Sequence, residues 1–287
     1  MNSSSGIGLI GCSDPCGKDA LATVDRLTEH LKSAGLKVFR TDYHGSDIEP
    51  FSSEAACAKA QKLIEMYKDP RIGMIFDISG GDLANSVLPY LDFSVIRASS
   101  KPFAGYSDLT TLVNAISVQT GRTGILYQIR NLVDPVYGDE QTDRFLRTFI
   151  SGSDALFDFD YQFLHGSDFC GELMGGNIRC LLKLAGTTCW PDFTGRILFL
   201  ESLGAMQPQL ITAIAQLKML GVFEQISGLV LGTFTRLESA GVPVWEMIRG
   251  FIHDRVPVVK TSQIGHGHDS RALKIGGFYS FLRRRSE

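Results

Sequence analysis

Short apolar runs bounded by glycine or proline alternate with amphipathic stretches of helical length along the first half of the chain. Short apolar runs are typical of buried strands, and longer stretches with helical periodicity are typical of helices. This alternation predicts a parallel sheet with crossover helices on its faces. The expected strands span residues 6–11, 36–40, 71–78, 94–104 and 123–127, and the expected helices span 18–34, 54–68, 84–91 and 108–120.

Residues 135–168 interrupt this pattern with one helical stretch, a Ser/Gly turn and a polar-aromatic run. The alternation then resumes, with strands expected at 169–174, 195–200, 227–232, 256–263 and 272–281 and helices at 177–185, 207–220 and 243–253. We therefore predict an α/β protein of two domains. Residues 1–134 would form a doubly wound, mostly parallel sheet with flanking helices, residues 135–168 the connection, and residues 169–287 a smaller α/β domain.

The composition is that of a globular protein able to bury a sizeable core, with 44% hydrophobic and 21% charged residues in a chain of 287. The net charge is −3, and the basic residues are scattered apart from Arg283, Arg284 and Arg285, so no nucleic acid polymer is expected as a partner. The sequence shows neither a leader-like segment nor an apolar run of about 18 residues. We therefore expect a cytoplasmic protein that does not contact a membrane.

Six cysteines occur in the chain. Without a secretion signal they predict reduced thiols rather than a disulfide framework. Cys12 and Cys16 are close in sequence, but no second close pair of Cys or His accompanies them, so a zinc or redox site is not favoured.

Ser107 stands between a predicted strand and a predicted helix, in the sequence KPFAGYSDLTTLVNAI. In open α/β sheets, ligands bind outside the carboxyl ends of the strands, where the loops carry polar groups. A serine at such a turn is exposed beside the unpaired N–H groups of the helix N-terminus, as in nucleophile elbows. The alternative is that Ser107 or Asp108 only caps the helix.

Two further strand ends carry groups of chemical interest. Gly80 and Gly81, in ISGGDLAN, follow an apolar strand, and glycines there let backbone N–H groups approach a ligand, as an oxyanion hole requires. They can equally form only a tight turn. Glu201 ends the apolar run of RILFLES, where a carboxylate needs a cationic or hydrogen-bonding partner such as a histidine. The alternative for Glu201 is a cap on the following helix.

His266 follows the predicted strand 256–263 in the glycine-flanked loop IGHGHD. An imidazole is the side chain best suited to accept and return a proton near neutral pH. His268, two residues later, is the rival candidate, and we expect it to be solvated. The pair could also suggest a metal site, but no carboxylate or cysteine stands at ligand spacing, so no metal is expected.

Together these positions form a Ser, Glu, His set in chain order, with a glycine pair near the nucleophile. His266 would activate Ser107, and Glu201 would orient the imidazole and stabilise its protonated form. This joint pattern favours a catalytic hypothesis over the separate structural explanations.

The sequence resembles the LD-carboxypeptidase and microcin C self-immunity family of serine peptidases. Five blocks, in order and at similar spacing, carry this resemblance: SGGDLANSVLPYLDF, KPFAGYSDLTTLVNAI, GELMGGNIRCLLKLAGT, GRILFLESL and IGHGHDSRALKIG. The resemblance implies a two-domain α/β enzyme, often a homodimer, with the triad Ser107, Glu201 and His266. It also implies that the backbone N–H groups of Gly81 and Asp108 form the oxyanion hole.

We also expect Gly80 and Asn177 to contact the substrate. Residues 79–83 read SGGDL where murein-recycling members usually have an Arg-Gly-Gly-Tyr-Gly type block, and this difference is closer to the microcin-immunity branch. The segment between nucleophile and glutamate, however, is shorter than in the immunity proteins. The expected enzyme is a serine carboxypeptidase without metal or cofactor, acting on a murein L,D-tetrapeptide or a peptidyl nucleotide. The alternative is a catalytically decayed member that binds peptides.

Overall fold

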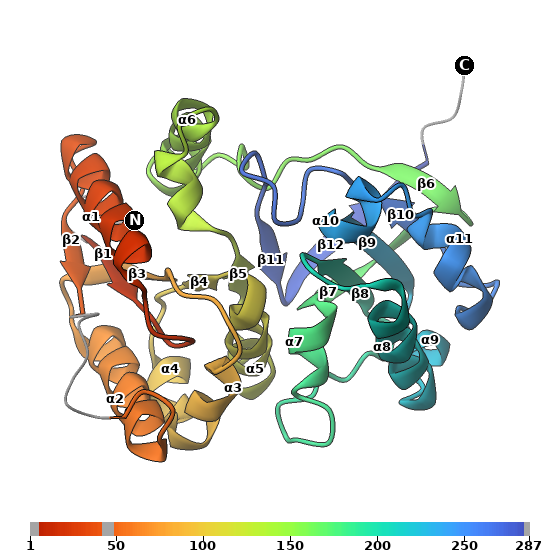
Figure 1. Ribbon diagram of the computed structural model, residues 1–287, viewed down its shortest axis with the longest axis horizontal. Helices are drawn as coiled ribbons and strands as arrows, with labels where there is room; N and C mark the ends of the chain where they lie inside the picture. The colour runs from red at the N-terminus through yellow and green to blue at the C-terminus, as the bar shows by residue number, and fades with distance from the viewer. Residues whose placement is uncertain (1–5, 42–48, 284–287) are drawn as a thin grey trace.

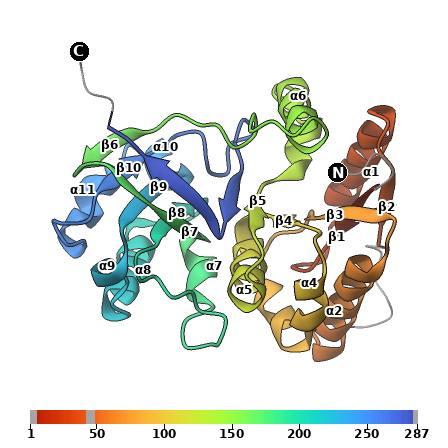
Figure 2. The same cartoon turned by 180° about the vertical axis from the view of Figure 1, so that it is seen from behind.

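The computed structural model describes residues 6–41 and 49–283, which form two sheets side by side (Figures 1 and 2). The first sheet has the strand order β11-β5-β4-β3-β1-β2. Only β11 is antiparallel to its neighbour. The strands are β1 (Gly6–Ile10), β2 (Val38–Arg40), β3 (Ile72–Asp77), β4 (Phe103–Gly105), β5 (Gly124–Leu126) and β11 (Leu273–Ile275).

Helices cover both faces of the first sheet. On one face, α1 (Lys18–Ser33) places Val24, Leu27 and Leu31 on one side of the helix, where they pack in a core that also contains Phe145 of α6 (Gly138–Phe149). The other face carries α2 (Ser53–Lys68), α4 (Phe93–Ala98) and α5 (Thr110–Thr120). The short helices of this half are α3 (Ala84–Val87), η1 (Leu88–Tyr90), η2 (Ser107–Leu109) and η3 (Ile129–Val133).

The second sheet has the order β12-β7-β8-β9-β10-β6, with parallel interior strands and an antiparallel strand at each edge. Its strands are β6 (Gln162–His165), β7 (Phe169–Asn177), β8 (Ile197–Ser202), β9 (Gly228–Phe234), β10 (Val258–Lys260) and β12 (Gly277–Phe281). Its helices are α7 (Ile178–Leu182), α8 (Gln207–Met219), α9 (Val222–Gln225), α10 (Thr235–Ser239), α11 (Val244–Ile248) and η4 (Arg249–Phe251). The predicted fold class, α/β with a mostly parallel sheet in the N-terminal half and a second α/β unit after it, is confirmed, and both sheets are rich in parallel strands.

Two predicted strands were wrong in extent. Residues 94–104 are not one strand, because the Asp92 carboxylate caps a helix by accepting from the N–H groups of Ser94 and Val95. Residues 272–281 are also not one strand: the chain turns at Gly276, whose φ is 76°, so that β11 joins the first sheet and β12 the second. Strand β6, from the predicted connection, joins the second sheet. The domain boundaries at 134 and 168 stay a prediction.

Helix α5 of the first half docks directly on strand β7 of the second. Asn114 donates from Nδ2 to the carbonyl of Gly175 and accepts at Oδ1 from the same residue's N–H, at 2.8 and 2.9 Å. Thr110 Oγ1 accepts from Asn177 N at 3.0 Å. Gly176 has a φ of 142°, and a Cβ there would lie 2.5 Å from Thr110 Oγ1. The glycine therefore permits the close approach that brings the strand ends of both halves together.

No helix within residues 6–41 and 49–283 is long and apolar enough to cross a bilayer. Residues 1–5, on which the expected absence of a leader partly rests, lie outside the described residues, as do Arg284 and Arg285.

Candidate active site

Ser107 occupies the sharp turn between β4 and α5. Its φ is 60°, and it is the only residue other than glycine with a positive φ in the described part of the chain. Such a conformation costs an L-residue roughly 1–2 kcal/mol. Neither Ser107 nor Asp108 caps the helix with its side chain, so the capping alternative was wrong. Ser107 instead lines a cavity of about 840 Å³.

Glu201 and His266 form a buried pair at the carboxyl ends of the second sheet. Glu201 is 1% exposed, and its Oε2 lies 2.7 Å from Nδ1 of His266. Its Oε1 accepts from Nδ2 of Asn177, at 3.0 Å, on the neighbouring strand. Both carboxylate oxygens are thus held. The alternative that Glu201 caps a helix was wrong, because Met206 is the N-cap of α8.

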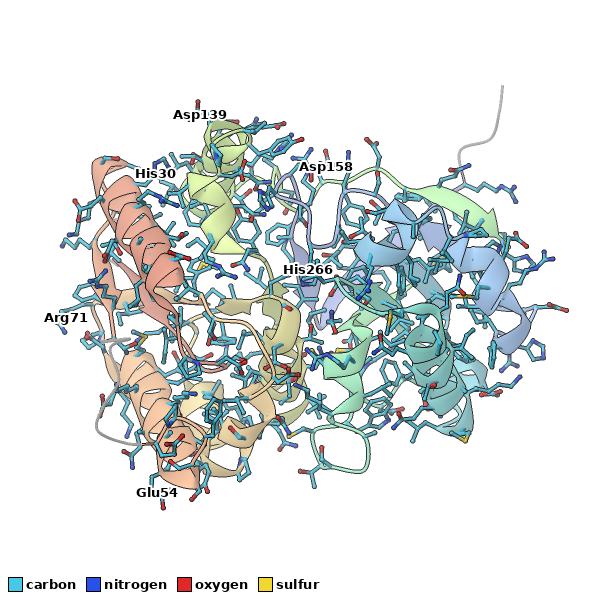
Figure 3. All side chains as sticks on the ribbon, in the orientation of Figure 1. His30, Glu54, Arg71, Asp139, Asp158 and His266 are labelled. Atoms are coloured by element: carbon cyan, nitrogen blue, oxygen red, sulfur yellow. The ribbon has the colours of Figure 1, made fainter. Side chains whose placement is uncertain are left out.

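His266 lies between the two halves of the molecule (Figure 3). Its Nε2 is buried and has no hydrogen-bond partner among the described residues. The ring of Tyr106, the residue before Ser107, meets the imidazole edge to face with 5.1 Å between centroids. Burial raises the pKa of Tyr106, and the negative charge of Glu201 raises it further. The phenol therefore stays protonated beside the Glu201–His266 pair.

The structure does not join the nucleophile and the base directly. The hydrogen bonds of the described residues include none between Ser107 and His266. In free enzymes such catalytic bonds are often long and tighten only when substrate is bound. The direct Ser107–His266 hydrogen bond therefore stays a prediction, while the Glu201–His266 contact and the position of Tyr106 are structural facts.

The loop that carries Gly81 is held in place by Asp14. Its Oδ1 accepts from the N–H groups of Asp82 and Leu83, at 2.9 and 3.1 Å. Gly81 has a φ of 128°, and a Cβ there would lie 2.1 Å from the carboxyl carbon of Asp14. Only glycine fits this position. The N–H groups of Gly81 and Asp108 have no acceptor among the described residues, and their part in an oxyanion hole stays a prediction.

The Asp108 side chain has a role that the sequence did not suggest. Its carboxylate is 0% exposed and accepts from Ser13 Oγ at 2.6 Å, Ala84 N at 2.8 Å and Lys183 Nζ at 2.6 Å. Lys183, which follows α7, also donates to the carbonyl of Asp82 at 2.8 Å. A lysine of the second half thus anchors the nucleophile turn and the glycine loop together.

Of these anchoring residues, Ser13 and Asp14 could have been found from sequence, because they follow the first predicted strand. Lys183 gave no signal, since it lies within the predicted helix 177–185.

Gly80 and Asn177 are the two residues expected to contact the substrate. The carbonyl of Gly80 accepts from Asp14 N at 3.2 Å, and Asn177 lines the Ser107 cavity. The Nδ2 of Asn177 is used by Glu201, so a substrate contact by either residue stays a prediction.

His268 lies outside the Glu201–His266 pair. Its side chain is 66% exposed, and its Nδ1 contacts the carboxylate of Asp134. Within the described ranges no group of three or more His, Cys, Asp or Glu side chains is placed to hold a metal ion.

Comparison with known proteins places the chain in a family. Residues 7–127 match the LD-carboxypeptidase N-terminal domain, and residues 170–280 match the LD-carboxypeptidase C-terminal domain. The chain therefore belongs to the LD-carboxypeptidase family, as the sequence blocks predicted. It is 24% identical to a putative carboxypeptidase of Vibrio cholerae, over 94% of this chain and 90% of the relative. It is also 24% identical to the microcin C7 self-immunity protein MccF of Escherichia coli, over 94% and 88%.

Solved structures share the fold. MccF in complex with glutamyl sulfamoyl guanosine superimposes with a TM-score of 0.85 at 22% identity, covering 98% of this chain and 94% of that one. Muramoyltetrapeptide carboxypeptidase from Oxalobacter formigenes gives a TM-score of 0.77 at 23% identity, covering 98% and 96%. At this identity the structural likeness establishes the fold, and the family match supports carboxypeptidase activity.

Proposed function

We propose that the protein is a serine-type carboxypeptidase that cleaves an amide near the carboxyl end of a small peptide or peptide conjugate. Ser107 Oγ attacks the carbonyl carbon while His266 Nε2 takes the hydroxyl proton. The N–H groups of Gly81 and Asp108 stabilise the oxyanion. When the C–N bond breaks, His266 returns the proton to the leaving amine, and water then hydrolyses the acyl-Ser107 ester by the same steps.

One observation carries this proposal. The Glu201 carboxylate is buried and holds His266 Nδ1 at 2.7 Å, while the buried Nε2 has no partner among the described residues. A carboxylate in this position fixes the tautomer and stabilises the imidazolium that forms when Ser107 is deprotonated. The strained backbone of Ser107 supports the same assignment, because strain at a positive φ is typical of functional turns.

Two substrate classes follow from the relatives. The muramoyltetrapeptide carboxypeptidase acts on a cell-wall peptide, and MccF was solved with an aminoacyl-sulfamoyl nucleoside. We propose that the protein acts on one of these small substrates, in the cytoplasm, as a homodimer, without metal or cofactor.

A fluorophosphonate probe tests the enzyme assignment. Wild type should be labelled and Ser107→Ala should not, and the labelled enzyme should lose all hydrolysis of a panel containing D-Ala-terminated murein peptides and aminoacyl-sulfamoyl adenosines. EDTA should leave the rate unchanged. Tight binding of a peptide by an unlabelled, inactive wild type would favour the alternative of a peptide-binding protein, and activity lost to chelator and restored by zinc would contradict the metal-free mechanism.

A further inference from the structure

A second cavity, of about 490 Å³, is lined by His266. Its walls come from the segment 128–135 after β5, from the histidine loop 265–268, and from α1, with Tyr106 and Leu203. Its charged lining residues are Arg26, Arg130, Asp134 and His268. Asp134 contacts His268 in this cavity, and neither Arg26 nor Arg130 forms an ion pair with a described residue.

The two cavities divide the reacting groups between them. Ser107 and Asn177 line the larger cavity, whereas His266 lines the smaller one, and Leu203 borders both. In the proposed mechanism, on which this inference rests, the amine that leaves must take its proton from His266 Nε2. The leaving group therefore belongs on the imidazole side, in the smaller cavity. The acyl part, bonded to Ser107, belongs in the larger one.

Arg130 is placed to recognise that leaving group. Its guanidinium is largely withdrawn from solvent, and burial lowers its pKa. Its Nε donates to Gln128 Oε1 at 3.2 Å, and its other N–H groups donate to none of the described residues. Nearby Asp77 is a poor partner, because its carboxylate already accepts from Cys12 N and from Ser79 N and Oγ.

We propose that Arg130 binds the terminal carboxylate of the amino acid that is released. A guanidinium offers two parallel N–H groups that match the two oxygens of a carboxylate. In an α-amino acid the amine and the carboxylate are attached to the same carbon, and His266 and Arg130 line the same cavity. The nitrogen of the released residue would meet His266 while its carboxylate meets Arg130, so that Arg130 selects substrates with a free carboxyl end.

Paired substrates test this assignment. We would compare a murein tetrapeptide ending in D-alanine with the same peptide ending in D-alaninamide, in wild type, Arg130→Gln and Arg130→Lys. Wild type should prefer the acid. Arg130→Gln should raise KM for the acid by about 10- to 100-fold with little change in kcat, because it removes hydrogen bonds to a charged group. The same variant should change KM for the amide by no more than about twofold. Arg130→Lys should have a KM for the acid between those of wild type and Arg130→Gln.

Arg26→Gln is the matched control at the same cavity. Arg26 is exposed and donates from Nη2 to Thr23 Oγ1 at 3.2 Å, so its replacement should change KM less than that of Arg130. Thermal melting of each variant separates recognition from misfolding. Equal hydrolysis of acid and amide by wild type, an equal loss on both in Arg130→Gln, or a larger effect of Arg26→Gln would overturn the inference. Arg130-dependent preference for an aminoacyl-sulfamoyl adenosine over the acid would overturn it in favour of a nucleotide leaving group.

Failure of the proposed function has a different signature, namely an unlabelled Ser107 and no hydrolysis of either peptide. Calorimetric binding of the acid and the amide to wild type and Arg130→Gln still decides the inference in that case. The inference is supported if wild type binds the acid more tightly than the amide and Arg130→Gln loses this preference. It is contradicted if wild type binds acid and amide equally and Arg130→Gln binds the acid as tightly as wild type does.

Discussion

The two halves of the molecule hold their candidate catalytic residues by different means. In the first half the backbone conformation positions them, with Ser107 at a φ of 60° and Gly81 at a φ of 128°. In the second half hydrogen bonds position them, because one oxygen of Glu201 accepts from Asn177 and the other contacts His266. We therefore expect the half that carries Ser107 to be sensitive to changes in backbone freedom, and the half that carries His266 to be sensitive to changes in polar partners.

The largest expected effect is on the nucleophile. Ser107→Ala should lower kcat by about 10⁶-fold, the loss seen when a serine hydrolase loses its nucleophile or base. The fold should remain, because Ser107 is only half-buried. Steady-state kinetics measure the rate, circular dichroism the fold, and Ser33→Ala on the exposed face of α1 serves as control. Near-full activity in Ser107→Ala would remove this residue from the mechanism.

Glu201→Gln should have the second-largest effect, a loss in kcat of up to about 10⁴-fold. The carboxylate orients the imidazole through Nδ1 and stabilises the imidazolium that forms during the reaction, and glutamine removes this charge while keeping the shape of the side chain. Steady-state kinetics of both proteins measure kcat, and circular dichroism checks the fold. A kcat within about tenfold of wild type would show that Glu201 does not act through His266.

Lys183→Met tests the contact between the two halves. It would leave the Asp108 carboxylate buried beside Ser13 and Ala84 without its cation. Breaking a buried pair on one side should lower the free energy of unfolding by about 3 kcal/mol. Chemical denaturation measures this, with the exposed Lys32→Met as control. If Lys183→Met and Asp108→Asn simply add in the double variant, the two residues are not coupled.

A smaller effect should distinguish two inactive variants at Ser107. Glycine adopts a positive φ without the steric cost that alanine meets, so Ser107→Gly should be more stable than Ser107→Ala by roughly 1 kcal/mol. Denaturant midpoints of the two variants measure the difference. Equal or reversed midpoints would mean that the turn stores no strain.

The smallest effect is expected at the second histidine. The His268 side chain is 66% exposed and lies outside the Glu201–His266 pair. Surface substitutions usually change free energies by about 0.5 kcal/mol or less, so His268→Ala should change kcat/KM by only a few-fold. His266→Ala should lose activity nearly as completely as Ser107→Ala. An inactive His268→Ala together with an active His266→Ala would reverse the assignment.

The candidate residues Ser107, Glu201 and His266 all follow predicted strands, and parallel strands bring their carboxyl ends to one edge of a sheet. Of the three, the structure joins Glu201 and His266 directly, and the part of Ser107 stays a prediction. The residues that position them were harder to find. Lys183 and Asp108 are 75 positions apart in sequence, and Tyr106 and His266 come from different halves. Contacts of this kind depend on how α5 docks on β7, which no local pattern encodes.

The errors in the predicted fold have local and distant causes. The apolar residues of Phe93–Ala98 favour a strand, but Asp92 stands before them as a helix cap and the segment is helical. The split of residues 272–281 between two sheets could not be derived, because ALKIGGFYSF is continuous in pattern and its pairing partners lie in β5 and β7. The chain passes from one sheet to the other at Gly276, which has a positive φ. A glycine within a strand pattern can equally indicate a bulge, a bend or a close approach of another backbone, so the sequence alone does not identify this turn.

Strands β11 and β12 also determine when each sheet can be completed during synthesis of the chain. Both follow every other described strand in the chain, yet one completes the edge of the first sheet and the other that of the second. Domains that fold independently can do so in turn as they leave the ribosome. The first sheet of this protein cannot be completed until β11 has been synthesised, about 150 residues after β5. A growing chain therefore holds both sheets incomplete until the same short segment emerges, and the two halves mature together.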